Sequence, residues 1–296
     1  MAQWVEFMDP DGQKMRLLTV DDVMLPPMPG LDKDLSKLRE FKFRDDDIIL
    51  TTYPRSGTHF MWEIIRMLKK GSSEYYKGEK TEFLELVNIN AMEKLEDRVV
   101  NTHLPPELLP VDYKNQKCKF VHVFRNPKDV LVSLYNHWVM GKDFFGYDGK
   151  FSGFFELAMQ GQVESGKWFD YELKYEKFFK SNPDIPSLVL SFEELKKDPV
   201  PNIKKVSEFL GLDRDDDLIA AIADAVSFNK MKAGKFEISS DILKQFMTDE
   251  AYNKMYRKGV AGDWKNWFTV AQNERFDAEF EKYMKNSSLK PRIQWE

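Results

Sequence analysis

The sequence predicts an α/β protein, built as a single domain over residues 1–296, with a mostly parallel central sheet flanked by helices. Four short runs of β-branched and apolar residues alternate with longer segments of helical spacing. Parallel strands need crossover connections, so this alternation is typical of a sheet with helices on both faces. No repeat, low-complexity tract or Gly/Ser linker divides the chain. Because ligands of such sheets bind beyond the carboxyl ends of the strands, function is expected in the loops that follow them.

Composition narrows the classes of function. Hydrophobic residues make up 42% and charged residues 31% of the chain, as in folded globular proteins, and the net charge is −5. A diffuse affinity for nucleic acid or anionic membranes is therefore not expected, and a polyanionic ligand would need a local cluster of cations. The single cysteine, Cys118, allows no internal disulfide and no cysteine-based metal site. The sequence shows no signal peptide and no apolar run of membrane-spanning length, so a cytoplasmic location is expected.

The first strand, residues 47–52, leads into a loop that suits an anion. The segment Tyr53-Pro54-Arg55-Ser56-Gly57-Thr58 connects this strand to a helix over residues 59–69. Free amides at a helix N-terminus, together with the helix dipole, favour negative charge. In this loop Arg55 adds a fixed positive charge, while Ser56 and Thr58 add hydroxyl donors. The loop lacks the Gly-Lys-Ser/Thr of a Walker A motif, and an ordinary strand-to-helix turn with polar caps is the alternative.

The second strand, residues 98–102, ends at His103, one of four histidines in the chain. An imidazole titrates near neutral pH, so a histidine at the ligand-binding edge of the sheet can act as a general base. His122 lies inside the third strand, residues 119–124, and is expected to be structural. A histidine at the end of a strand can also be incidental, and position alone does not decide between these interpretations.

The third strand is followed by two residues that could share one phosphate. Arg125 and Ser133 are eight positions apart, at the end of the strand and in the second turn of a helix over residues 127–140. This helix begins with Asn126-Pro127, a capping residue and a proline in the first turn. The fourth strand is expected over residues 187–192, and the other helices over residues 165–179, 201–210, 215–225 and 271–284.

A second cationic motif lies near the C-terminus, at Arg257-Lys258-Gly259. Its cations can make charge-assisted hydrogen bonds to a phosphate, and the glycine allows the backbone to come close. A solvated charged turn is the alternative interpretation.

Taken together, these motifs resemble those of the cytosolic sulfotransferase family. The segment 53–58 resembles that family's 5′-phosphosulfate loop, and Thr102-His103-Leu104-Pro105 resembles the motif of its catalytic histidine. Arg125 with Ser133, and Arg257-Lys258-Gly259, resemble the groups that bind the donor's 3′-phosphate. The resemblance runs in order from Tyr53 to Glu274, about three quarters of the chain.

The resemblance implies transfer of a sulfo group from 3′-phosphoadenosine 5′-phosphosulfate (PAPS) to a small organic acceptor. The acceptor would be a hydroxyl or amine of a phenol, alcohol or steroid, and 3′-phosphoadenosine 5′-phosphate (PAP) would be the second product. It further implies in-line displacement without a metal, with His103 as base and Arg55 beside the transferred group. The donor-binding residues would be Arg55, Ser56, Gly57, Thr58, His59, Phe60, Arg125, Ser133, Phe192, Val226, Phe228, Arg257, Lys258 and Gly259. The acceptor-binding residues would be Phe83, His137, Trp138, Phe144 and Phe145, and a homodimer would form through Lys265, Thr269, Val270 and Glu274.

Several positions depart from the family's pattern. Arg55, His59 and Phe60 stand where the family has lysine, threonine and tryptophan, and Asn101 stands where it has a lysine. Phe192 and Val226 replace a tyrosine and a threonine. These departures keep open a nucleotide binder that has lost efficient chemistry. A kinase-like phosphoryl transferase is a second alternative, disfavoured by the missing Gly-Lys-Ser/Thr and by the groups suited to a 3′-phosphate.

Overall fold

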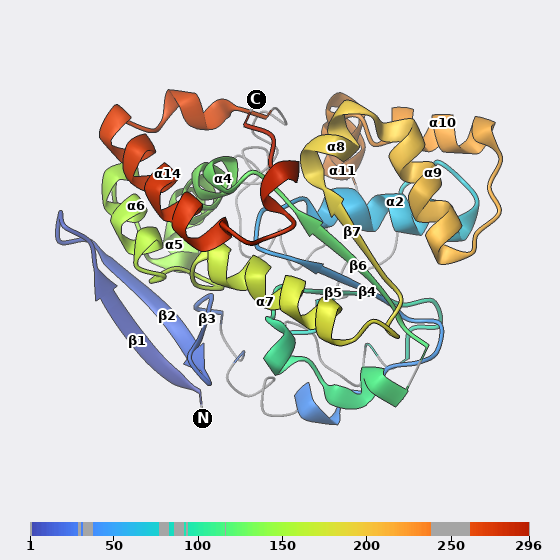
Figure 1. Cartoon of the computed structure of the whole chain (residues 1–296), viewed down its shortest axis with the longest axis horizontal. Coiled ribbons are helices and arrows are strands. Elements are labelled where there is room, and N and C mark those ends of the chain that lie inside the picture. Colours follow the sequence, from blue (N-terminus) through green and yellow to red (C-terminus); the bar gives the residue numbers. More distant parts are fainter. Residues whose placement is uncertain are drawn as a thin grey trace.

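A four-stranded parallel sheet forms the centre of the molecule (Figure 1), as expected from the sequence. The structure is a computed structural model that describes residues 2–28, 31, 38–76, 83–85, 92, 94–115, 117–237 and 261–295. The strand order is β5-β4-β6-β7, and all three pairings are parallel. The strands are β4 (Ile48–Thr52), β5 (Val99–Thr102), β6 (Lys119–Phe124) and β7 (Ser187–Ser191), each within one residue of its predicted bounds.

Helices pack on both faces of this sheet, because successive residues of each strand point to opposite sides. Ile49 belongs to a core cluster that includes residues of α4, α7 and α14, whereas Ile48 and Leu50 belong to a second cluster with α2, α9 and α10. The parallel α/β architecture is therefore confirmed. These helices are α2 (Thr58–Lys70), α4 (Pro127–Met140), α7 (Trp168–Ser181), α9 (Pro199–Leu210), α10 (Asp216–Ala225) and α14 (Val270–Met284).

The capping residues match the local sequence signals. The Asn126 side chain accepts hydrogen bonds from the backbone N–H groups of Lys128 and Asp129, with Pro127 in the first turn of α4. Thr269 and Gln272 form a capping box at the start of α14. Within the described residues, no helix combines the length and apolar character needed to cross a bilayer.

Several elements were not expected from the sequence. An antiparallel sheet of β1 (Gln3–Met8), β2 (Lys14–Val20) and β3 (Val23–Leu25) lies beside the helical layer of α5 and α6 (Figure 1). The additional α-helices are α5 (Lys142–Phe145), α6 (Phe151–Met159), α8 (Phe192–Lys197) and α11 (Phe228–Glu237). Short 3-10 helices are η1 (Leu38–Glu40), η2 (Pro106–Leu108), η3 (Val111–Asn115), η4 (Asp263–Asn266) and η5 (Lys290–Arg292).

Candidate active site

The loop between β4 and α2 allows close approach of an anion. Arg55 and Gly57 both have positive φ angles, 70° and 106°, so the chain turns sharply into α2. A Cβ on Gly57 would lie 2.5 Å from Cδ2 of Phe192, which leaves room for glycine alone. The Ser56 Oγ is buried and has no hydrogen-bond partner among the described residues. Since an unpaired buried hydroxyl is costly, this atom fits a ligand that supplies an acceptor oxygen.

Two guanidinium groups meet at this loop. The Nε of Arg55 donates to the Ser133 Oγ on α4 at 3.2 Å, and the Nη1 of Arg125 donates to the carbonyl of Arg55 at 3.1 Å. The Oγ1 atoms of Thr52 and Thr58 lie 2.6 Å apart and tie the first turn of α2 to the end of β4. The structure thus brings Arg55, expected at the 5′ end of the donor, together with Arg125 and Ser133, expected at its 3′-phosphate.

Next to these cations lie two aromatic rings. The ring centroids of Phe60 and Phe192 are 5.8 Å apart at an interplanar angle of 73°. The Arg125 guanidinium lies 4.6 Å from the Phe192 centroid, and the Lys196 ammonium lies 4.8 Å from the Phe60 centroid. Burial lowers the pKa of Lys196, and the charge of Arg125 lowers it further. Lys196 is a cation of this site that the sequence analysis missed.

The other residues assigned to the adenosine lie on neighbouring elements. Val226 is buried at the end of α10, in the same core cluster as Phe60 and Phe192. Phe228 is half-buried at the first residue of α11. His59 is half-buried in the first turn of α2.

The geometry around His103 fixes its tautomer. Its Nδ1 lies 2.8 Å from the carbonyl oxygen of Thr52. A carbonyl oxygen accepts hydrogen bonds and cannot donate them, so Nδ1 carries the proton and Nε2 keeps its lone pair. Burial lowers the pKa of His103 to about 4, and the positive charge of Arg55 contributes in the same direction. His103 is therefore neutral at physiological pH, the state that a general base requires.

Two buried carboxyl groups flank His103 and Arg55, and the sequence analysis selected neither. Glu85 accepts hydrogen bonds from the backbone N–H of His103 at 2.7 Å and from the Thr102 Oγ1 at 2.8 Å. Burial raises the pKa of Glu85 to about 7, although these hydrogen bonds lower it. Burial also raises the pKa of Glu164 to about 7, partly offset by the charge of Arg55. An isolated acidic residue belongs to no motif, so the sequence carried no signal for either group.

Two of the residues expected to contact the acceptor, Phe83 and His137, lie near the imidazole of His103. The Phe83 ring lies 5.0 Å from the His103 ring and 6.1 Å from the His59 ring, measured between centroids. Burial lowers the pKa of His137 well below its usual value, and the charges of Arg55 and His103 add to this effect. The Nδ1 of His137 is buried and has no hydrogen-bond partner in the described part of the chain. It is therefore a second polar atom that a ligand could satisfy.

The aromatic residues after His137 pack into the core. The rings of Trp138 and Phe145 stack with centroids 4.9 Å apart, and both residues are buried. The Phe145 ring also lies 5.0 Å from that of His137. The position of the Phe144 side chain lies outside the described structure.

Other predicted residues lie outside or away from this site. Arg257, Lys258 and Gly259 fall in residues 238–260, outside the described residues. In the proposed dimer segment, Thr269 caps α14 and Val270 is 75% exposed. Lys265 lies in η4, and Glu274 lies in α14.

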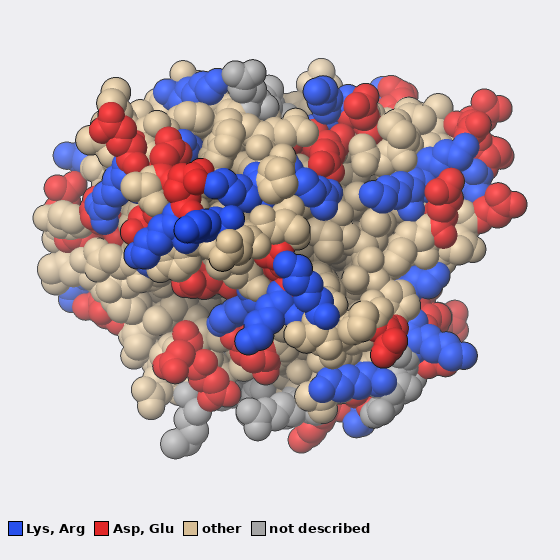
Figure 2. All heavy atoms as spheres, in the orientation of Figure 1, with Lys and Arg blue, Asp and Glu red and all other residues tan. Residues whose placement is uncertain are grey.

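On one face of the molecule, charged side chains of both signs are present and interspersed (Figure 2). Binding of a polyanion would therefore depend on the cations gathered around the β4–α2 loop. Among the described residues, no group of three or more His, Cys, Asp or Glu side chains could hold a metal ion.

The chain is similar to known sulfotransferases in sequence and in fold. The profile of the sulfotransferase domain matches residues 45–288. The rat sulfotransferase 1 family member D1 is 35% identical over 283 residues, which cover 92% of this chain and 94% of that protein. Human sulfotransferase 2A1 is 35% identical over 280 residues, 90% of this chain and 94% of that protein. The crystal structure of mouse sulfotransferase SULT7A1 complexed with PAP superposes with a TM-score of 0.75 at 32% identity, covering 92% of this chain and 95% of that one.

Proposed function

This chain belongs to the cytosolic sulfotransferase family, and from that premise we propose that it transfers a sulfo group from PAPS to the hydroxyl or amine of a small organic acceptor. The family accounts for the sulfo transfer and for PAPS as donor. The proposal adds the residues, their roles and the class of acceptor. The observation that carries it is a neutral His103 whose Nε2 lone pair is free, placed in the same site as Arg55 and the phosphate loop.

The residues present fit the donor. The buried Ser56 Oγ lacks a partner among the described residues, and Gly57 allows both the sharp turn into α2 and the close packing of the Phe192 ring. Arg55 and Ser56 would hold the sulfo end, and Arg125 and Ser133 the 3′-phosphate. Phe60 would face the adenine, with Phe192, Val226 and Phe228 beside it. Bound PAPS supplies the activated sulfo group and is released as PAP. The remaining donor contacts would come from Thr58, His59, Arg257, Lys258 and Gly259.

His103 would act as general base toward the acceptor. Its Nε2 takes the proton of the acceptor hydroxyl while the Nδ1 hydrogen bond to the Thr52 carbonyl holds the ring. The pKa of about 4 keeps the imidazole neutral, but it also makes a weak base. A bound anion beside Arg55 would offset the positive charge there and raise the pKa of His103 toward a more effective value.

Arg55 would supply the fixed positive charge for the sulfo group. Its hydrogen bond to Ser133 orients the guanidinium, and its positive φ angle holds the backbone in the turn. A preorganised cation stabilises charge that develops on oxygen during transfer. Arginine cannot lend a proton to the departing group, so its contribution here is electrostatic.

The acceptor is expected to be flat and largely apolar, with phenols first. Phe83 lies beside His103 and presents an aromatic ring to whatever occupies the space near Nε2. The buried Nδ1 of His137 offers one polar contact for a second hydroxyl or a carbonyl. Other alcohols, steroids and arylamines follow phenols as candidates.

The direct test is incubation with PAPS and a mixed panel of phenols, alcohols, steroids and arylamines, read by the mass gain of each product. We expect sulfated phenols from the wild type. The variant His103→Ala should lose transfer, by about 10²–10⁴-fold if only the base is removed, and should still bind PAP. Phosphorylated products from ATP would instead support the kinase-like alternative. Tight PAP binding without product across the panel would support the nucleotide binder.

A further inference from the structure

The hydroxyl of Tyr171 donates a hydrogen bond to the same carbonyl oxygen that orients His103. It lies 2.9 Å from the Thr52 oxygen, and the His103 Nδ1 lies 2.8 Å from that oxygen. We propose that Tyr171, together with Ser165, is a positioning residue that sets the orientation of the catalytic imidazole. This inference rests on the proposed function, in which His103 is the base.

The environment of Tyr171 makes its hydroxyl a fixed donor. The side chain is 1% exposed, and its ring packs edge to face with Tyr53 at 5.4 Å. Burial raises the pKa of Tyr171 well above its usual value of 10, so the hydroxyl keeps its proton. A buried tyrosine hydroxyl that donates to a backbone carbonyl cannot rotate away without losing this hydrogen bond in a place that water reaches poorly.

A second contact comes from the segment that leads into α7. The Oγ of Ser165 lies 3.4 Å from the carbonyl oxygen of His103 and donates to it. Ser165 has a φ angle of 61°, a left-handed conformation that is unfavourable for a serine and is maintained here by its surroundings. Residues 165–171 therefore contact both the backbone of His103 and the acceptor of its ring proton.

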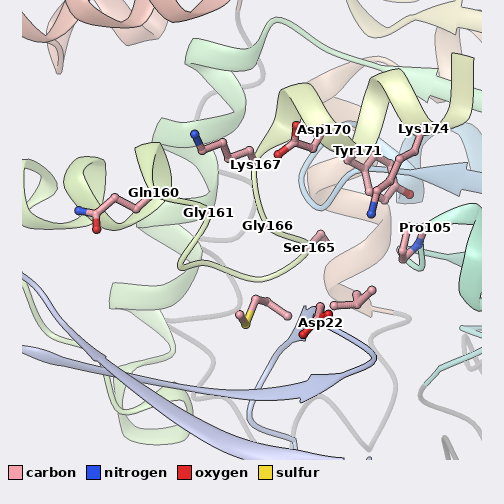
Figure 3. Close-up of a pocket in the computed structure, with 12 residues that line it drawn as sticks. Asp22, Pro105, Gln160, Gly161, Ser165, Gly166, Lys167, Asp170, Tyr171 and Lys174 are labelled. Carbon is pink, nitrogen blue, oxygen red and sulfur yellow. The ribbon is translucent and has the colours of Figure 1, made fainter. Parts of the chain in front are cut away.

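The same residues line a pocket that opens to the surface. Ser165 and Tyr171 lie around it together with Pro105 and Lys167 (Figure 3). Water could therefore enter next to Tyr171 if its hydroxyl were removed, and it could replace the lost hydrogen bond in part. A mobile water would not fix the direction of the Thr52 carbonyl, so we expect a moderate loss of activity.

Another buried tyrosine of α7, Tyr175, provides a matched control. Tyr175 lies one turn further along α7, is fully buried, and donates its hydroxyl to the carbonyl of Leu104 at 2.7 Å. Tyr175→Phe thus removes a similar buried hydrogen bond next to His103 but keeps the Tyr171 donor to the Thr52 oxygen, although the Tyr175 hydroxyl also interacts with that of Tyr171. Ser165→Ala removes the weaker second contact and provides an independent variant if Tyr171→Phe does not fold.

Tyr171→Phe has two effects, and each of them would raise the pKa of His103. The Thr52 carbonyl loses a competing donor and becomes a better acceptor for Nδ1–H, which favours the imidazolium form. A loosened ring would also gain access to water, which favours the same form. The titratable groups around His103 that remain in the variant are Arg55, Glu85, His137 and Glu164.

We expect Tyr171→Phe to lower kcat about two- to tenfold, with unchanged affinity for PAP. The pKa of His103, followed by NMR on its ring proton and assigned with His103→Ala, should rise by about half a unit or more. Tyr175→Phe should leave both the pKa and kcat near the wild-type values. Ser165→Ala should lower kcat by a smaller factor.

The inference is overturned if the pKa of His103 is the same in Tyr171→Phe and the wild type, or if both tyrosine variants lose kcat equally. An unchanged kcat in Ser165→Ala would overturn the part that concerns Ser165. Failure of the wild type to sulfate any acceptor would contradict the proposed function instead. The NMR comparison would then still decide whether Tyr171 acts on His103, because it does not depend on turnover.

Discussion

The buried hydroxyl of Ser56 carries a cost to the stability of the free protein. Its Oγ is buried and lacks a partner among the described residues, and such an atom costs about 1–3 kcal/mol of folding free energy. A bound phosphosulfate or phosphate would supply the missing acceptor. The same atom therefore favours the ligand-bound form and disfavours the free one.

We predict that Ser56→Ala raises the melting temperature of the free protein but reduces the increase produced by PAP. Removing the hydroxyl relieves the unpaired group when no ligand is present and deletes one ligand contact when PAP is bound. Thermal unfolding with and without PAP measures both effects. A lower melting temperature without ligand would mean that the hydroxyl already has a stabilising partner.

With His103 as the proposed base, its low pKa predicts how activity depends on pH. The base must be neutral, so activity should be present above its pKa and be lost as the pH falls through that value. With a pKa of about 4 in the free enzyme, the acidic limb of kcat/KM should lie well below the 6.5 of an ordinary histidine. A pH profile with PAPS and a phenol checks this, and a limb at or above pH 6.5 would contradict it.

The contribution of His103 to folding stability also decreases as the pH falls. The unfolded chain binds a proton to His103 at a higher pH than the folded chain does, so its contribution is present above about pH 6.5 and decreases as the pH falls toward 4. The contribution of Glu85 to folding stability depends on pH in the opposite direction, because burial raises its pKa to about 7 in the folded chain. Its contribution is therefore present below about pH 4.5 and is lost as the pH rises through 7.

At the level of elements, buried strands were predictable and short irregular segments were not. A run such as residues 119–124 is apolar throughout because a parallel strand is covered on both faces, and this pattern stands out in the sequence. The strand β1 is largely exposed, and β2 combines buried Met15, Leu17 and Leu18 with exposed Lys14 and Arg16, so neither forms the continuous apolar run by which the other strands were recognised. In the site, the motifs around Arg55 and His103 could be recognised from the sequence because the residues of each motif are contiguous in the chain.

The start of α8 explains why Lys196 was missed. The sequence analysis extended the fourth strand to Phe192, but the Ser191 side chain accepts a hydrogen bond from the Glu194 backbone N–H and begins a helix there. In a helix, residues four apart lie on the same face, so Phe192 and Lys196 both point toward the Phe60 side of the site. In a strand the two residues would share a face but lie about 13 Å apart, too far to belong to one contact.

We predict that Lys196→Met weakens PAP binding by about three- to tenfold, since a half-buried cation beside Arg125 adds to the local positive charge. Lys197→Met is the matched control, because the neighbouring Lys197 is exposed on the same helix. Titration calorimetry at two salt concentrations should show a smaller salt dependence for Lys196→Met than for the control. Equal affinities of the two variants would rule out a role for Lys196 in donor binding.

At the scale of the whole molecule, one central sheet joins the two core clusters, so we expect residues 1–296 to behave as one domain. The cations of the site come from the β4–α2 loop, the end of β6 and α8, which are far apart in sequence. Tertiary structure therefore assembles the site, and residues such as Glu85 and Glu164 gain their altered pKa values only through burial in it.

The proposed homodimer can be tested at Val270. Its side chain is 75% exposed at the start of α14, so it is accessible to a second copy of the chain. A self-associating segment of Lys265, Thr269, Val270 and Glu274 would form a contact related by a two-fold axis, in which each copy of Val270 lies near its counterpart. A negative charge there would place two like charges in a largely apolar contact.

We therefore predict that Val270→Glu converts a dimer into a monomer, measured as molar mass by light scattering over a range of concentrations. Val111→Glu is the control, because Val111 is 72% exposed in η3 and lies outside the proposed contact. It introduces the same charge on the surface and should leave the dimer intact. If Val270→Glu and the wild type have the same mass at every concentration, the segment does not form the dimer. If both glutamate variants dissociate, the cause is the added charge rather than this contact.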